Sequence, residues 1–255
     1  MNRIFWLTYN TMVQIVRQRI LYTVLFFAIS LIAVGGVLDS AAPGQKGIMV
    51  LDIGLGAINL FGVMISIVMG VNLLYQELDK KTVYNVLSKP VSRTEFVIGK
   101  YLGQVAAIAI VLAGMAMCLV LATWAAEGTV PGIAGQALWA IYLELMMVSA
   151  IAMLFSSFST PYLSGLFTLG FWIVGSLASE IRNYQRYWDL KAYERVVTKI
   201  FYILPDFSKL NLKDRVPYNL APPEGYVWQI TLYALLYTAG LILVSSIIFR
   251  RRDFK

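Results

Sequence analysis

Six long runs of apolar residues dominate the chain, and most polar residues lie between them. Glu144, in the fourth run, is the one charged residue inside any of them. The runs cover residues 20–38, 53–75, 101–126, 130–155, 156–179 and 226–249. Each run is long enough to cross a hydrocarbon core of about 30 Å as a helix, which satisfies its own backbone hydrogen bonds. The pattern predicts an all-α integral membrane protein, with six transmembrane helices forming a single domain over residues 1–255.

Composition supports a membrane protein and excludes several other classes. Of the 255 residues, 59% are hydrophobic and 14% are charged, whereas soluble domains average about 45–50% and about 25%. The net charge is +7, but the basic residues flank the apolar runs, so they indicate membrane orientation and not nucleic-acid binding. With no histidine and one cysteine, the chain can form neither an internal disulfide nor a His/Cys metal site nor a Ser-His-Asp triad.

Basic residues close to the ends of the spans set the expected orientation. Arg17 and Arg19 precede the first run, and Arg250, Arg251 and Arg252 follow the last. Positive charges next to a span favour the cytoplasmic side. We therefore expect a multi-pass protein of the inner (plasma) membrane with both termini in the cytoplasm. The first run exceeds the 7–15 residues usual for the core of a signal peptide, so we expect it to remain as a helix.

Two segments outside the runs have amphipathic patterns. Residues 1–19 combine a mixed apolar stripe with few charges, which predicts a helix at the membrane interface; the alternative is a basic leader that only sets orientation. In residues 180–225, apolar positions recur at helical spacing up to Leu204, and Pro205 ends the pattern. This predicts an extracytoplasmic amphipathic helix between spans five and six. It is either a structural cap over the outer ends of the spans or a lid or docking surface for exported cargo. The sequence leaves an extracytoplasmic partner of this loop open.

The loop over residues 76–100 contains a short apolar face formed by Val83, Val86 and Leu87, and Pro90 then prevents a longer helix. The residues alone leave two interpretations: a docking element for a soluble partner, or a solvated loop with cytoplasmic positive charge.

Three polar side chains inside the predicted spans are candidates for function. Glu144 is costly in a membrane unless it is paired, protonated or facing an aqueous cavity. Asn59 and Asn72 lie in the second run, where side-chain amides commonly form hydrogen bonds between helices. These residues either line a translocation path or link neighbouring helices.

Small residues recur every four positions in the second run, at Gly62, Ser66 and Gly70. Such spacing permits close helix packing. The row either packs helices together, within the chain or at an interface between subunits, or lines a translocation path.

The loop also resembles the motif that follows the second span in type-2 ABC transporter permeases. That motif has an acidic residue before "GT", then "LL", "P-V/I-S/T-R" and a "GK" that opens the third span. The matching residues are Glu77, Thr82, Leu87, Pro90, Val91, Ser92, Arg93, Gly99 and Lys100. Lys81 and Val83 depart from it, standing where glycine and leucine are usual. The closing residues 249–254 are similar to the family's "F-x-R-R-D" ending. The long outer loop is similar to the branch of gliding-motility and nitrous-oxide-reductase-maturation permeases.

The resemblance implies the membrane half of an ATP-driven exporter. Two permease subunits, identical or different, would pair with two copies of a cytosolic ATP-binding subunit. Residues 80–87 would form a coupling helix in a groove of that ATPase. The coupling residues that the resemblance implies are Glu77, Lys80, Lys81, Thr82, Val83, Val86, Leu87, Pro90 and Arg93. ATP and Mg²⁺ would be bound by the partner, with no cofactor on this chain. The sequence contains no G-x-x-x-x-G-K-[ST] phosphate loop, so we expect no ATPase activity from the chain alone.

Two other function classes remain open from the sequence. A secondary transporter or channel would be expected to contain intramembrane charged pairs or inverted repeats, and neither is clear here. A membrane anchor without transport would have no ATPase partner. The apolar spans suit lipid, peptide or other amphipathic cargo, and equally a subunit that transmits force.

Overall fold

The computed structural model of the chain describes residues 2–17, 24, 26–27, 29–31, 46–79, 93–127, 130–180 and 204–251. Within these ranges all regular secondary structure is helical. The α-helices are α1 (Asn2–Arg17), α3 (Lys46–Asp79), α5 (Arg93–Glu127), α6 (Ala134–Ser156), α7 (Pro161–Ser176) and α10 (Tyr226–Arg251). Two short 3₁₀ helices are η1 (Phe207–Leu210) and η2 (Lys213–Arg215).

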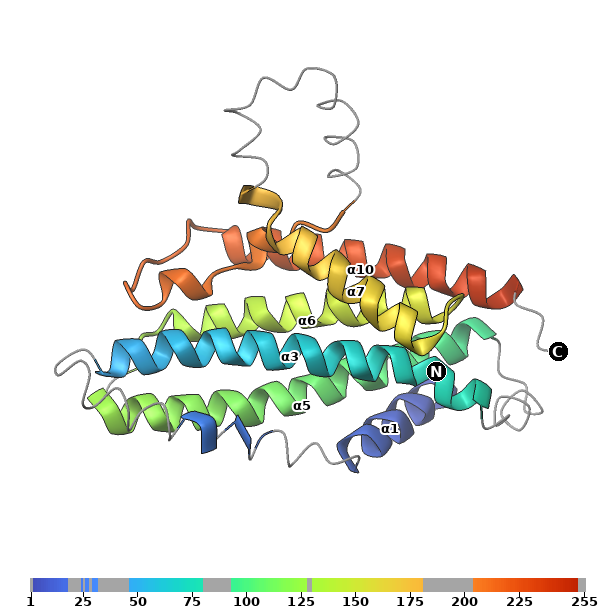
Figure 1. The fold of residues 1–255 in the computed structure, drawn as a ribbon, viewed down its shortest axis with the longest axis horizontal. Coiled ribbons are helices and arrows are strands. Elements are labelled where there is room, and N and C mark those ends of the chain that lie inside the picture. The colour runs from blue at the N-terminus through green and yellow to red at the C-terminus, as the bar shows by residue number, and fades with distance from the viewer. Residues whose placement is uncertain are drawn as a thin grey trace, which may run out of the picture.

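Helix α6 lies at the centre of an up-and-down bundle (Figure 1). It packs against α3, α5, α7 and α10, and 72% of the residues in its most apolar stretch are buried. A helix that is apolar on all sides is typical of such a central position. Its neighbours α3, α5 and α10 leave large apolar side chains exposed on their outer faces, as expected of helices that face lipid.

The two ends of the bundle differ. The ends of α3, α6 and α10 and the start of α5 lie at one end (Figure 1), which we call the Arg251 end. Residues 130–133, before α6, and residues 204–225, before α10, lie toward the other, the Glu127 end. The described residues that flank the permease-like motif, Asp79 and Arg93, therefore lie toward the opposite end of the bundle from residues 204–225.

Four of the predicted spans are long apolar helices in the described part of the chain. They are Gly47–Leu73, Thr94–Ala126, Ala134–Ser156 and Tyr226–Arg250, all suited by length and composition to cross a membrane. They correspond to the second, third, fourth and sixth runs. The prediction of an all-helical membrane protein is thus confirmed, whereas the number of six spans is not established.

The fifth and first runs account for the difference in span number. Helix α7 covers the fifth run with 16 residues, fewer than the roughly 20 needed for a full crossing. It is short because the helix starts only at Pro161: Thr160 is extended, the conformation favoured before proline, and a proline fits the first helical position. The first run lies mostly outside the described residues, as do residues 181–203 with most of the predicted outer amphipathic helix.

Helix α1 packs against the first turns of α5. The Thr8 Oγ1 donates a hydrogen bond to the carbonyl oxygen of Gly99 at 3.2 Å. A Cβ atom on Gly103 would lie 2.6 Å from the Cβ of Thr11, so glycine is what allows the two helices to approach. The opposite face of α1 exposes Trp6. The placement of α1 at a membrane interface stays a prediction.

The row of small residues in α3 lies against α6 of the same chain. A Cβ on Gly62 would lie 2.8 Å from the Cδ1 of Leu145, and one on Gly70 would lie 2.6 Å from the Cβ of Ala152. The carbonyl oxygen of Ser149 would be 3.0 Å from the Gly70 Cβ. These glycines therefore bring α3 and α6 close together within one subunit.

Replacing Gly70 with alanine is expected to lower the free energy of unfolding by about 1–3 kcal/mol, the usual cost of overpacking. The new methyl group would meet a Cβ and a backbone carbonyl, neither of which can rotate away. Thermal unfolding of the purified protein in detergent would measure the loss. Gly240→Ala is the matched control, because nothing lies within 4 Å of that position. Equal melting temperatures for both variants would contradict this packing.

Candidate functional site

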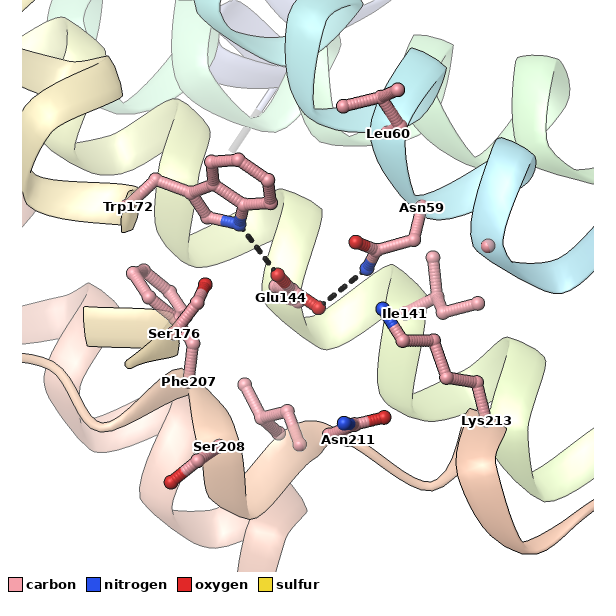
Figure 2. Close-up of a pocket in the computed structure, with 12 residues that line it drawn as sticks. Asn59, Leu60, Ile141, Glu144, Trp172, Ser176, Phe207, Ser208, Asn211 and Lys213 are labelled. Atoms are coloured by element: carbon pink, nitrogen blue, oxygen red, sulfur yellow. Dashed lines mark hydrogen bonds between the residues drawn. The ribbon is translucent and has the colours of Figure 1, made fainter. Parts of the chain in front are cut away.

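A pocket of about 260 Å³ lies where α3, α6 and α7 meet the outer stretch of residues 204–216 (Figure 2). One acidic and one basic side chain face it, together with amides, hydroxyls and apolar walls. The lining residues are Gly56, Asn59, Leu60, Ile141, Glu144, Trp172, Ser176, Phe207, Ser208, Leu210, Asn211 and Lys213.

Glu144 forms the floor of the pocket and links three helices. Its side chain is 6% exposed. The Nδ2 of Asn59 on α3 donates to Oε2 at 2.7 Å, and the Nε1 of Trp172 on α7 donates to Oε1, also at 2.7 Å (Figure 2). Both carboxyl oxygens thus accept hydrogen bonds from neutral donors. The arrangement joins α3, α6 and α7 around one buried acid.

Lys213 brings the positive charge to this pocket from η2. Figure 2 shows its side chain reaching toward Asn59 and Glu144, and its ammonium group interacts electrostatically with the Glu144 carboxylate. Among the described residues, none forms an ion pair or hydrogen bond with the Lys213 ammonium. The two opposite charges therefore face one another across the cavity without direct contact.

Buried apolar side chains hold the outer stretch in the bundle. Four of them, Phe207, Leu210, Leu212 and Val216, are each no more than 2% exposed. Gly175 near the end of α7 makes the approach possible, because a Cβ there would collide with the carbonyl oxygen of Pro205 and with the Phe207 ring. Residues 204–216 thus form one side of the pocket.

Hydrogen bonds fix the same stretch to α10. The backbone N–H of Asp206 donates to the Tyr233 hydroxyl at 2.9 Å, and the Tyr226 hydroxyl donates to the carbonyl oxygen of Lys209 at 2.8 Å. The Lys209 ammonium lies 3.8 Å from an Asp206 carboxylate oxygen and 5.2 Å from the centre of the Tyr233 ring. The position of Lys213 in the pocket is therefore set by a well-anchored backbone.

The structure brings together two of the three polar residues identified within the spans. Asn59 and Glu144 are in direct contact. Asn72 lies about 20 Å farther along α3 and is not among the pocket residues. Sequence reasoning missed Trp172, which lies in an apolar run, and Lys213, which is one of many charges in the outer loop. Within the described ranges, no three acidic or cysteine side chains gather as metal ligands.

Most of the predicted coupling residues fall outside the described part of the chain. Glu77 is in the last turn of α3, and Arg93 is the first residue of α5. Both positions are at the Arg251 end of the bundle. The residues outside the described ranges are Lys80, Lys81, Thr82, Val83, Val86, Leu87 and Pro90.

Comparison with known proteins identifies the family. No match is found among the curated proteins. A family model described as ABC-2 family transporter protein matches residues 6–254, almost the entire chain. This match agrees with the all-helical bundle and with the permease-like motif between the second and third apolar runs. The chain therefore belongs to the ABC-2 family of transporter proteins, as a membrane-spanning permease.

Proposed function

We propose that this permease couples ATP hydrolysis by a separate cytosolic ATPase subunit to the export or extraction of a substrate. The observation that carries the proposal is the family match over residues 6–254. The sequence supports a separate ATPase subunit, since it contains no phosphate-binding loop. ATP and Mg²⁺ would be held by the partner, and the functional unit would contain two permease and two ATPase subunits.

Coupling would pass through the connection between α3 and α5. Residues 80–87 would dock into the ATPase, and ATP binding would change the separation of the two docked segments. Docking energy that differs between the two separations then biases the arrangement of the spans. The residues that flank the connection, Asp79 and Arg93, lie at the Arg251 end of the bundle (Figure 1), whereas Asn59 of the pocket lies in the half of α3 that is farther from this end. This separation suits a subunit in which ATPase binding at one end changes the arrangement of the spans around the pocket.

The same geometry supports the expected orientation. Arg93 and Arg250 both lie at the Arg251 end, where positive charge favours the cytoplasm. We therefore place this end and both termini in the cytoplasm, with residues 204–225 on the outer side of the inner membrane. In that orientation the Glu144 pocket would lie on the outer half of the path.

Purification of the tagged chain in mild detergent tests this function. We expect a cytosolic protein with a phosphate-binding loop to co-purify in a one-to-one ratio, identified by mass spectrometry. A mild and a harsh detergent should be compared, since only the mild one should preserve the complex. Recovery of the folded chain alone from several mild detergents would contradict the proposal and favour a channel or an anchor.

A further inference from the structure

We propose that the Glu144 pocket binds a small zwitterion, whose ammonium group contacts Glu144 and whose acidic group contacts Lys213. The chemical class is a primary amine joined to a phosphate or carboxylate by a short linker. That such a molecule is the exported cargo rests on the proposed function, whereas its binding does not.

Glu144 has capacity for a cation that its present partners do not use. Asn59 and Trp172 each donate one hydrogen bond to it, while a carboxylate offers about four acceptor sites. Both donors are neutral, so they orient the carboxyl group without supplying a charge of their own. A buried carboxyl group stays ionised when it is paired with a cation in direct contact. An ammonium group that reaches the floor of the pocket would provide that pairing.

Lys213 supplies the complementary half of the site. Its side chain is half-buried and points into the pocket (Figure 2). An ammonium group offers three hydrogen-bond donors on a flexible stem, which suits a phosphate or carboxylate. A zwitterion supplies a partner of opposite charge to each of the two side chains, whereas a ligand with one charge supplies a partner to only one of them.

The size and walls of the pocket suit a headgroup-sized molecule. Since one water occupies about 30 Å³ of liquid, a volume of about 260 Å³ is equivalent to roughly eight or nine waters. Phosphoethanolamine and small amino acids are small enough to enter a pocket of this volume. Ser176 and Asn211 offer further polar contacts, and Ile141 and Phe207 form apolar walls.

The same chemistry occurs in a soluble molecule and in a lipid headgroup. Leu60 lines the pocket and is 47% exposed, so the pocket reaches the outer surface of α3. Met64 and Val68 follow at four-residue spacing and are 48% and 58% exposed. This row, on one face of α3, could receive an acyl chain attached to the headgroup. The experiment therefore compares free phosphoethanolamine with phosphatidylethanolamine.

The first arm measures binding of phosphoethanolamine by isothermal titration calorimetry, using the full chain in nanodiscs of phosphatidylcholine. We expect saturable binding that weakens at least tenfold in Lys213→Met and in Glu144→Gln. Ethanolamine alone and inorganic phosphate should each bind at least tenfold more weakly. Arg215→Met is the matched control: it removes an exposed positive charge from the same short helix, and its binding should equal that of the wild type.

The second arm measures the melting temperature in nanodiscs with and without phosphatidylethanolamine. A lipid source predicts stabilisation by this lipid that Lys213→Met removes and Arg215→Met keeps. A soluble source predicts binding in the first arm only. The proposal is overturned if neither arm responds, or if Lys213→Met responds as the wild type does. Lys213 is half-exposed, so this variant should fold even if Glu144→Gln does not. If the chain binds the zwitterion but co-purifies with no ATPase, the proposed binding site stands. Only the proposed export function is then contradicted.

Discussion

A chain with aspartate in place of Leu87 is expected to lose its stimulation of the partner ATPase while still inserting into the membrane. In the proposed coupling segment, Leu87 belongs to the short apolar face that would dock into the ATPase groove. Losing the burial of a leucine costs about 2 kcal/mol, and placing a carboxylate in an apolar groove adds at least as much. The combined loss of about 4 kcal/mol is roughly a thousandfold in docking affinity.

The measurement is the ATPase rate of the partner with the wild-type chain and with the variant, both in nanodiscs. Leu220→Asp is the matched control, because Leu220 is 58% exposed. It lies between η2 and α10, far along the chain from the coupling segment. Stimulation should disappear in Leu87→Asp and persist in Leu220→Asp. Unchanged stimulation in Leu87→Asp would contradict the assignment of the coupling segment.

Replacing Asn59 with leucine is expected to destabilise the bundle by about 3 kcal/mol. The change removes the 2.7 Å hydrogen bond to Oε2 of Glu144 and leaves a buried carboxylate oxygen without its donor, a loss that is larger for charged groups than for neutral ones. Asn59 is itself 4% exposed, so water has little access to replace the amide. Unfolding of the purified chain in detergent would measure the effect.

The double variant Asn59→Leu/Glu144→Leu distinguishes a structural hydrogen bond from a functional one. Replacing both partners with apolar groups removes the unpaired carboxylate but leaves the Trp172 N–H without its acceptor. We therefore expect the double variant to regain about half of the stability lost in Asn59→Leu. The double variant should not bind phosphoethanolamine, because it lacks the Glu144 carboxylate. A double variant as unstable as Asn59→Leu would show that the pair does not act as a coupled unit.

The helical class of the fold follows directly from the sequence, because long apolar runs have few stable alternatives in a membrane. The runs could not show that α7 begins only at Pro161 and is short. Nor could they show that Phe207 and its neighbours fold onto the end of α7, since that depends on Gly175 leaving space for the Phe207 ring. Apolar periodicity predicts which segments are helices, but not which loops enter the bundle.

Only two of the four hydrogen-bonding or charged side chains discussed for the candidate site could be identified from the sequence. Glu144 and Asn59 were identifiable because polar side chains are rare and costly in apolar runs. Trp172 was not, since an indole fits an apolar run whether or not its N–H has a partner. Lys213 is one basic residue among several in a polar loop, and only the folded structure places it opposite Glu144.

The rate of ATP hydrolysis, measured on the purified chain and on its complex in the same nanodiscs, tests the central claim most directly. We expect no hydrolysis above that of empty nanodiscs for the chain alone. We expect hydrolysis by the complex, with one ATP-binding subunit for each permease. Hydrolysis by the chain alone, or a complex of stable composition without ATPase activity, would contradict the conclusion that this permease works through a separate ATPase.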